Sequence, residues 1–170
     1  MEKNIVLVGF MGTGKTTIAR LLAQRFNAEC VDLDMLIEEK EGMSIVDIFK
    51  TKGEPYFRKI EKDIVSKVSS SSGKVIACGG GVVLDKENVD RLKNNGLMIC
   101  LTARPEIILT RTKSYSHRPL LNVDNAKVKI KELLKKRQPY YTQADYTLDT
   151  SDLDIEGVVK NIRDWIEHKA

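Results

Sequence analysis

The sequence has few of the residues that cross-link small secreted domains or hold metal clusters: three cysteines and two histidines in 170 residues. Cys30, Cys78 and Cys100 are far apart, and no C-x-x-C pair or Cys/His cluster occurs. This arrangement is typical neither of a disulfide framework nor of a zinc site. We therefore expect three reduced thiols in the core of a cytoplasmic protein.

Long apolar runs and a large excess of charge of one sign are also absent. No run approaches the length of a membrane-spanning helix, and no signal-peptide pattern is found. The net charge is only +4 although 31% of the residues are charged, so we interpret the lysine-rich stretch 127–136 as the solvated face of a helix. These absences predict neither a membrane nor a nucleic acid as a partner; we also expect a monomer.

Short apolar, β-branched runs alternate with helical patterns along the chain, which predicts a three-layer α/β domain with a parallel sheet. At 170 residues and 42% hydrophobic, the chain has the size and apolar content of one domain, residues 1–170. Five strands are expected at 4–8, 30–31, 74–77, 97–101 and 146–148. Helices are expected at 15–26, 33–41, 44–52, 55–69, 85–94, 104–112, 126–142 and 155–168.

Two features interrupt these patterns. Pro139 falls within a long helical pattern, so we expect it to kink that helix or to lie in its last turns. Residues 113–125 show no periodicity, and a long connection of this kind is typical of a mobile lid.

The segment between the first strand and the first helix fits G-x-x-x-x-G-K-[ST], the phosphate-binding P-loop: Gly9-Phe10-Met11-Gly12-Thr13-Gly14-Lys15-Thr16. Its glycines allow consecutive N–H groups to face a phosphate, and the following helix adds the positive end of its dipole. Lys15 would reach the β- and γ-phosphates, and Thr16 would bind Mg²⁺. The pattern therefore predicts a nucleoside triphosphate site rather than a glycine turn that merely joins a strand to a helix.

Two carboxylates, Asp32 and Asp34, follow the second strand. Ligands of open parallel sheets bind at the carboxyl ends of strands, where these side chains could serve Mg²⁺ and a hydroxyl group. Helix capping is the alternative: Asp32 could be the N-cap, and Asp34 a favourable acid in the first turn. Because a P-loop lies one strand away, we favour the functional interpretation.

Arg58 and Glu61 are three residues apart on an expected helix. Glu61 could hold the guanidinium group of Arg58 while it faces an anion, although a surface ion pair has the same spacing. Gly79-Gly80-Gly81 directly follows the third strand. Three flexible residues there destabilise the fold unless something must approach the backbone closely, so we favour a substrate contact over a tight turn.

Two further arginines could contact an anion. Arg118, in the expected lid, has the location needed to stabilise charge on a transferring phosphoryl group when the lid closes. Arg137 lies late in a long helix and could be a second anion contact, although alone such an arginine is more often a surface residue.

Taken in their order along the chain, the motifs resemble those of the shikimate kinases, and the resemblance runs over nearly the whole chain. They are Gly12-x-Gly14-Lys15-Thr16, Asp32-x-Asp34, Gly53-Glu54-x-x-Phe57-Arg58-x-x-Glu61, Gly79-Gly80-Gly81, Arg118-Pro119-Leu120-Leu121 and Arg137-x-x-x-Tyr141. Each pattern is short, but their order and spacing together are specific. The resemblance implies a P-loop kinase fold with a substrate-binding region at 33–61 and a lid at 113–125. It also implies transfer of the γ-phosphoryl group of ATP to shikimate, giving shikimate 3-phosphate in aromatic amino-acid synthesis.

The resemblance further implies roles for single residues. Lys15, Asp34 and Arg118 would be catalytic, with Asp34 as the hydroxyl acceptor and base. Shikimate, a carboxylate with three hydroxyl groups, would contact Asp34, Arg58, Arg137 and the backbone of Gly80. Thr16 and Asp32 would serve Mg²⁺. The nucleotide would contact Gly12, Thr13, Gly14, Lys15, Thr16, Thr17, Arg111 and Arg118.

Some assignments stay open at the level of sequence. Arg111 could stack on adenine or be a charge on a helix surface. Phe49 and Phe57 resemble the apolar pocket wall of the family, but aromatic residues at helical spacing more often belong to the core. Residues 150–154 occupy the place where members of the family cover the adenine, without the arginine that the resemblance leads us to expect.

Two other functions compete with this interpretation. A GTPase-like switch would need an N-K-x-D motif, and no Asn here is followed by Lys; its D-x-x-G motif occurs only at 154–157, far along the chain from the P-loop. A small kinase acting on gluconate or a nucleoside monophosphate would share the P-loop. The arginine pair, the D-x-D motif and the glycine run favour shikimate over these acceptors.

Overall fold

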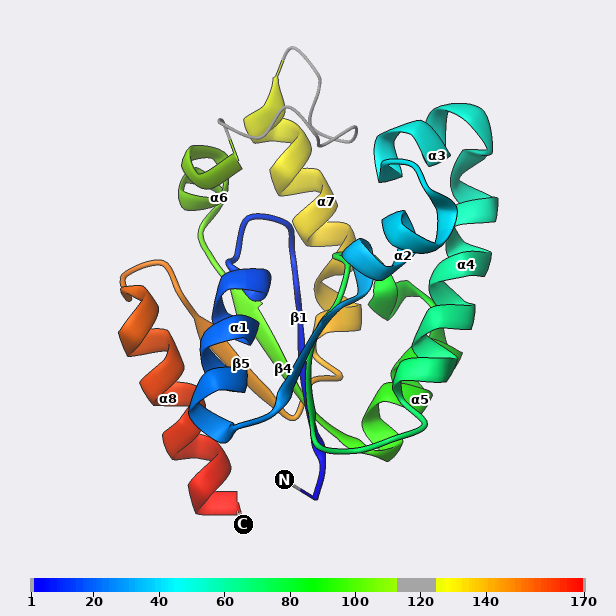
Figure 1. Ribbon diagram of the computed structural model, residues 1–170. Coiled ribbons are helices and arrows are strands. Elements are labelled where there is room, and N and C mark those ends of the chain that lie inside the picture. Colours follow the sequence, from blue (N-terminus) through cyan, green and yellow to red (C-terminus); the bar gives the residue numbers. More distant parts are fainter. Residues whose placement is uncertain (1, 113–124, 170) are drawn as a thin grey trace.

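The computed structural model describes residues 2–112 and 125–169, and Figure 1 shows their arrangement. Five parallel strands form one sheet in the order β2-β3-β1-β4-β5. The strands are β1 (Asn4–Gly9), β2 (Glu29–Asp32), β3 (Lys74–Ala77), β4 (Gly96–Thr102) and β5 (Tyr146–Asp149). The helices are α1 (Lys15–Phe26), α2 (Leu33–Glu41), α3 (Ile45–Thr51), α4 (Gly53–Val68), the 3-10 helix η1 (Val82–Leu84), α5 (Lys86–Asn94), α6 (Pro105–Thr112), α7 (Ala126–Tyr141) and α8 (Ile155–Lys169).

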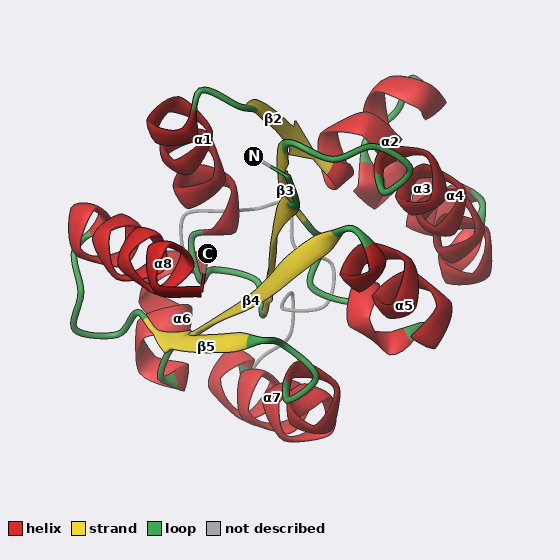
Figure 2. Cartoon of the chain, turned by 90° about the horizontal axis from the view of Figure 1, so that it is seen from below, coloured by secondary structure: helices red, strands yellow, loops and turns green. Residues whose placement is uncertain are grey.

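The sheet lies between two layers of helices because successive side chains of a strand point to opposite faces. On β1, Ile5 and Leu7 pack in the apolar cluster that includes α1 and α8, whereas Val6 and Val8 pack with α4, α5 and α7. All four are at most 1% exposed, as expected of a strand that is covered on both faces. Figure 2 shows the two helical layers on opposite sides of the sheet.

The sequence prediction of a three-layer α/β fold agrees with this architecture, and every expected strand and helix is present. The differences are at the boundaries: α4 begins at Gly53 rather than at Pro55, and β2 extends to Glu29 and Asp32. Among the described elements, only the short helix η1 was not predicted. Pro139 lies in the last turn of α7, one of the two positions expected for it.

The prediction of three core thiols is wrong for Cys30. Cys78 and Cys100 are buried, but Cys30 is exposed on β2. The reason is that β2 is an edge strand, paired only with β3, and its first two residues are uncovered. All three cysteines are free thiols.

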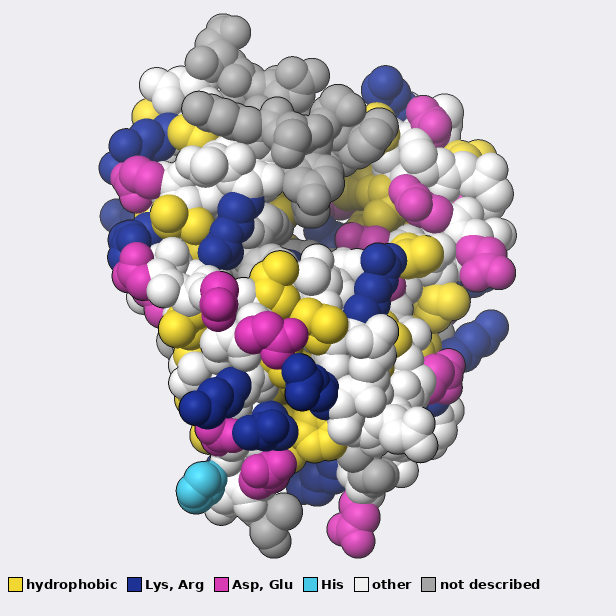
Figure 3. Space-filling model, turned by 60° about the vertical axis from the view of Figure 1, so that its left-hand side comes forward, with side chains coloured by type: hydrophobic (Ala, Val, Ile, Leu, Met, Phe, Trp, Pro, Cys, Tyr) yellow, Lys and Arg dark blue, Asp and Glu magenta, His cyan; other side chains and the backbone are white. Residues whose placement is uncertain are grey.

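Charges of both signs are mixed on the surface. Figure 3 shows Lys and Arg side chains among Asp and Glu side chains on one face of the molecule. Ion pairs between exposed residues, such as Arg25 with Glu156 at 2.9 Å, contribute to this mixture. Within the described ranges, no helix is both long enough and apolar enough to cross a lipid bilayer.

Candidate active site

The segments that follow three neighbouring strands meet at the carboxyl edge of the sheet. The P-loop follows β1, Asp34 lies in the first turn of α2 after β2, and the Gly79-Gly80-Gly81 run follows β3. Parallel pairing of β1, β2 and β3 in one sheet brings these segments to the same edge. This is the edge at which open α/β sheets bind their ligands.

The P-loop has the backbone geometry that a phosphate site requires. Gly12 and Gly14 have φ angles of 77° and 91°, conformations that a larger residue disfavours, and Gly14 is the N-cap of α1. The Nζ of Lys15 donates to the carbonyl oxygens of Gly9 and Phe10, both at 2.9 Å. The ammonium group of Lys15 is thus held against the P-loop. The loop leads directly into the amino end of α1, where the helix dipole favours an anion.

A cavity of about 610 Å³ lies in front of this loop, and we call it the P-loop cavity. Its walls include the expected nucleotide contacts Gly12, Thr13, Gly14, Lys15, Thr16, Thr17 and Arg111. The hydroxyl of Thr13 is buried and donates to the carbonyl of Phe10 at 2.7 Å, so it closes the loop on itself. Arg118, expected to contact the nucleotide and to act in catalysis, lies outside the described residues, as do residues 113–124 of the expected lid.

Arg111 joins α6 to the segment after β5. Its Nη1 donates to the hydroxyl of Thr150 at 3.0 Å, and its Nη2 donates to the Thr150 carbonyl at 2.9 Å. Thr150, Leu153 and Ile155 line the P-loop cavity beside Arg111. Arg111 is therefore part of the wall of the P-loop cavity rather than a charge on an open helix surface, and its stacking on adenine stays a prediction.

Asp32 caps α2 and also contacts the P-loop threonine. Its Oδ1 caps α2 by accepting from the backbone N–H groups of Asp34 (3.0 Å) and Met35 (3.3 Å). Its Oδ2 accepts from the hydroxyl of Thr16 at 2.7 Å. The cap fixes the carboxylate beside the P-loop threonine, and a hydroxyl paired with a carboxylate suits Mg²⁺, which keeps several waters.

A second cavity of about 630 Å³ opens beside the first, and we call it the arginine cavity. It is lined by Met11, Thr16, Asp32, Asp34, Met35, Glu38, Ser44, Ile45, Val46, Phe49, Phe57, Arg58, Glu61, Gly79, Gly80, Gly81 and Arg137. Four residues, Thr16, Asp32, Asp34 and Gly80, line both cavities. A group held in one cavity can therefore meet a group held in the other next to Asp34.

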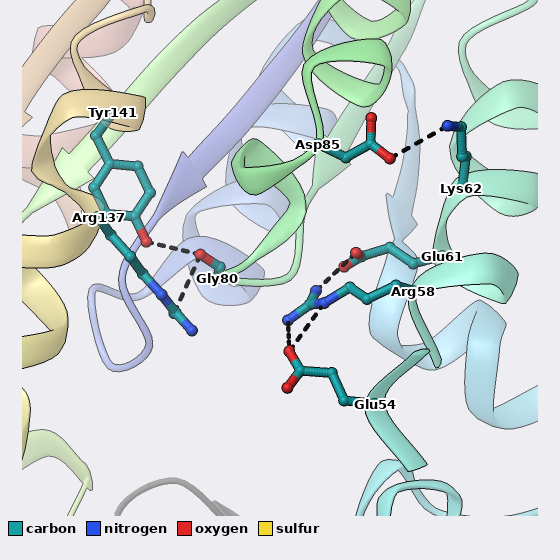
Figure 4. Close-up of polar contacts among 8 residues, drawn as sticks. All are labelled: Glu54, Arg58, Glu61, Lys62, Gly80, Asp85, Arg137 and Tyr141. Atoms are coloured by element: carbon teal, nitrogen blue, oxygen red, sulfur yellow. Dashed lines mark hydrogen bonds and ion pairs between the residues drawn. The ribbon is translucent and has the colours of Figure 1, made fainter. Parts of the chain in front are cut away.

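Arg58 is held by two carboxylates on its own helix. Its Nη1 donates to Glu61 at 2.7 Å, and its Nη2 and Nε donate to Glu54 at 3.1 and 3.3 Å (Figure 4). Burial alone would lower the pKa of Arg58, but the two carboxylates raise it above its usual value. The guanidinium group is thus fixed in direction before any ligand arrives.

Glu61 is the most buried carboxylate of this cluster. It is 1% exposed, and its Oε1 has no hydrogen-bond partner among the described residues. Burial is the main cause that raises the pKa of Glu61, and the pKa stays above its usual value although the Arg58 guanidinium lowers it. Because an arginine stays charged in proteins, the short contact from Arg58 still makes Glu61 an acceptor.

Arg137 differs from Arg58 in its surroundings. It is 6% exposed, and no carboxylate of the described residues lies within 4.0 Å of its guanidinium group. Its polar contacts are a long bond from Nη1 to the carbonyl of Gly80 at 3.4 Å and an interaction with the Tyr141 hydroxyl, and its guanidinium lies 5.6 Å from the ring centroid of Phe10. A buried cation without an anion is unfavourable, so this site is suited to bind an anion.

The three glycines after β3 each face a different side chain. A Cβ atom on Gly79 would lie 2.7 Å from Oδ1 of Asp34, and one on Gly81 would lie 2.5 Å from Nη2 of Arg58. A Cβ on Gly80 would lie 3.4 Å from Nη1 of Arg137. Side chains of the site itself therefore approach this backbone closely, and the expected substrate contact of the glycine run stays a prediction.

Phe49 and Phe57 both line the arginine cavity, with ring centroids 5.0 Å apart. Phe57 is also 4% exposed and part of the apolar core, so both interpretations apply to it. The two rings form the apolar wall of the cavity beside its charged groups.

Two residues with evident contacts were given no role from the sequence. Glu54 lies four residues before Arg58 on α4, and Tyr141 lies four residues after Arg137 on α7. Both spacings put the pair on one helix face, which is the signal that could have found them. The Tyr141 hydroxyl donates to the Gly80 carbonyl at 2.7 Å.

Comparison with known proteins gives consistent matches. The family model described as shikimate kinase matches residues 11–167 of the chain. A shikimate kinase of Caldanaerobacter subterraneus subsp. tengcongensis is 49% identical over 169 residues, which cover 99% of each chain.

Solved structures agree with these sequence matches. The structure described as shikimate kinase from Acinetobacter baumannii in complex with shikimate has a TM-score of 0.94 and 38% identity, covering 98% of this chain and 94% of that one. Shikimate kinase from Aquifex aeolicus has a TM-score of 0.85 and 34% identity, covering 98% and 97% of the two chains. The chain therefore shares the fold of these shikimate kinases over nearly its full length.

Proposed function

The chain belongs to the shikimate kinase family and phosphorylates shikimate with ATP as the donor, and from this premise we propose how its residues divide the reaction. ATP occupies the P-loop cavity and shikimate occupies the arginine cavity. The γ-phosphoryl group then meets the acceptor hydroxyl beside Asp34 and Gly80, which line both cavities.

The observation that carries this assignment is the buried guanidinium group of Arg137. It lies in the arginine cavity without a carboxylate partner among the described residues, and shikimate brings a carboxylate. Arg58 supplies a second planar donor whose direction is set by Glu54 and Glu61. Together the two arginines bind the carboxylate of shikimate and so place its hydroxyl groups toward the P-loop cavity.

Asp34 accepts the proton of the attacking hydroxyl group. It lies in the first turn of α2, where the bond from its N–H to the Asp32 carboxylate fixes its backbone. The backbone of Gly80 contacts the substrate as well. Positioning and charge stabilisation account for most of the catalysis of phosphoryl transfer, so this alignment of base and acceptor is the main contribution of the arginine cavity.

The P-loop cavity provides charge stabilisation. Lys15 and Arg118 neutralise charge on the transferring phosphoryl group. Thr16 and Asp32, already joined by a hydrogen bond, hold Mg²⁺. When bound there, Mg²⁺ supplies further neutralisation of the phosphate charge. Arg111 and the segment 150–154 surround the adenine.

Residues 33–61 act as the substrate-binding region of a single domain, and residues 113–125 act as its lid. We propose further that the enzyme is a cytoplasmic monomer. Free thiols at all three cysteines fit a reducing compartment. The large hydrophobic residues that are exposed among the described ones, Met35, Leu84, Val128, Tyr140 and Ile155, lie on four different elements, which fits a chain without a large apolar interface.

The acceptor can be tested by coupled detection of ADP with ATP and Mg²⁺, comparing shikimate, gluconate and a panel of nucleoside monophosphates at matched concentrations. We expect turnover with shikimate only. Turnover with another acceptor would retain the P-loop assignment but overturn the roles given to Arg58, Arg137 and Asp34. ATP binding without turnover on any acceptor would favour a nucleotide switch.

An Arg58→Lys variant is expected to raise the KM for shikimate by about ten- to a hundredfold. Lysine is a point charge and cannot replace a planar fork that also bonds Glu54 and Glu61. The KM for ATP should stay within about twofold, because Arg58 lines only the arginine cavity.

The matched control for this variant is Arg25→Lys, which changes an exposed arginine paired with Glu156 on the surface. Steady-state kinetics with each substrate varied in turn separate the two KM values. If Arg58→Lys left shikimate affinity unchanged, Arg58 would have no part in carboxylate binding.

A further inference from the structure

The middle carbonyl of the glycine run is bound differently from its two neighbours. The carbonyl of Gly79 accepts from the N–H of Val82 at 3.2 Å, and that of Gly81 accepts from Leu84 at 3.1 Å, as part of the turn that forms η1. No backbone N–H of the described residues donates to the carbonyl of Gly80. This peptide therefore depends on side chains for its orientation.

Tyr141 supplies the shorter of the two side-chain contacts. Its hydroxyl donates to the Gly80 carbonyl at 2.7 Å, whereas Nη1 of Arg137 is 3.4 Å from the same oxygen (Figure 4). Tyr141 is 7% exposed, and its ring belongs to the apolar core. Burial raises the pKa of Tyr141 to about 12, so the hydroxyl keeps the proton that it donates.

Building on the proposed function, we propose that Tyr141 is a positioning residue for shikimate: its hydroxyl binds the Gly80 carbonyl and thereby keeps Arg137 available for the carboxylate of the substrate. The bond from Tyr141 also sets the direction of the neighbouring backbone N–H group. Because the peptide after Gly80 is trans, a carbonyl held toward α7 turns the N–H of Gly81 the opposite way.

The effect on Arg137 follows because the Gly80 carbonyl and the carboxylate of the substrate would compete for its guanidinium group. A buried carbonyl that loses its hydrogen bond needs another donor, and Arg137 already lies 3.4 Å away. Without the Tyr141 hydroxyl, the guanidinium group would be drawn toward Gly80 and away from the anion that it serves.

The test is Tyr141→Phe, which keeps the ring in the core and removes only the hydroxyl group. We expect the KM for shikimate to rise by about tenfold, while the KM for ATP and kcat change by less than about twofold. The matched control is Tyr140→Phe, the same change at the neighbouring residue, which is 39% exposed. The melting temperature of both variants is measured alongside the kinetics.

A double-variant cycle separates positioning from a purely structural role. If Tyr141 acts through Arg137, the KM effects of Tyr141→Phe and Arg137→Lys are less than multiplicative in the double variant, whereas those of Tyr141→Phe and Arg58→Lys multiply. A lower melting temperature with an unchanged shikimate KM would overturn the proposal, as would fully multiplicative effects with Arg137→Lys.

The same measurements distinguish this proposal from the one on which it rests. If wild-type protein failed to use shikimate, or if Arg137→Lys left its KM unchanged, the assignment of the arginine cavity would be wrong. If Arg137→Lys weakened shikimate binding and Tyr141→Phe did not, only the role of Tyr141 would be lost.

Discussion

An Asp34→Asn variant is expected to lose about 10²- to 10⁴-fold in kcat while it still binds ATP and shikimate. Asparagine has nearly the same shape as aspartate, and its backbone N–H can still donate to the Asp32 carboxylate that fixes the first turn of α2. It cannot accept the proton of the attacking hydroxyl group. The loss should therefore be confined to the chemical step.

The kinetics of this variant should be compared with those of Asp63→Asn, the same change at an exposed residue of α4. Direct titration of shikimate and ATP, without turnover, gives the two binding constants. An Asp34→Asn enzyme with full activity would remove Asp34 from catalysis. A loss that appeared as much in shikimate affinity as in kcat would make Asp34 a binding residue rather than a base.

Most of the fold could be predicted because its local signals are strong. The run from Ile5 to Val8 is apolar on both faces and is buried on both faces. The edge strand β2 was predicted too short because Glu29 and Asp32 are polar and have no such pattern. Their pairing with Lys74 and Ala77 of β3 makes them strand residues, and pairing across the sheet is a tertiary effect.

In the site, too, contacts within one helix could be predicted from the sequence, whereas contacts between distant segments could not. The spacing of Arg58 and Glu61 on one helix indicated their contact, because residues three apart on a helix are neighbours. The contacts of Gly80 with Arg137 and Tyr141 join residues 57 and 61 positions apart in the chain. The family resemblance placed Gly80 and Arg137 at the same substrate, but no local pattern encodes the contact of Tyr141 with Gly80, which only the fold reveals.

The glycine run illustrates what a sequence can and cannot indicate. Its composition indicated that something must approach the backbone, because three glycines after a strand otherwise destabilise it. It could not indicate that Asp34, Arg137 and Arg58 each face a different glycine. The close approach depends on helices α2, α4 and α7, which are brought to the run by packing on the sheet.

A Lys15→Ala variant is expected to lower kcat by about 10²- to 10³-fold, the range seen when one preorganised donor to a developing charge is removed. In the structure its Nζ is already held by the carbonyls of Gly9 and Phe10, so the cation is in place before the phosphate arrives. Alanine leaves the loop with its glycines but without this charge. Lys160→Ala, at an exposed position of α8, is the matched control.

The informative feature of the Lys15 variant is its dependence on the acceptor. Lys15 lines the P-loop cavity and not the arginine cavity, so the slow ATP hydrolysis that uses water as acceptor should fall by the same factor as shikimate phosphorylation. Arg58→Lys, in contrast, should leave hydrolysis unchanged and affect only shikimate. Measuring ADP release from each variant with and without shikimate tests both expectations. If Lys15→Ala slowed shikimate phosphorylation but spared hydrolysis, Lys15 would act on the acceptor, and the division of the site into a donor and an acceptor cavity would be wrong.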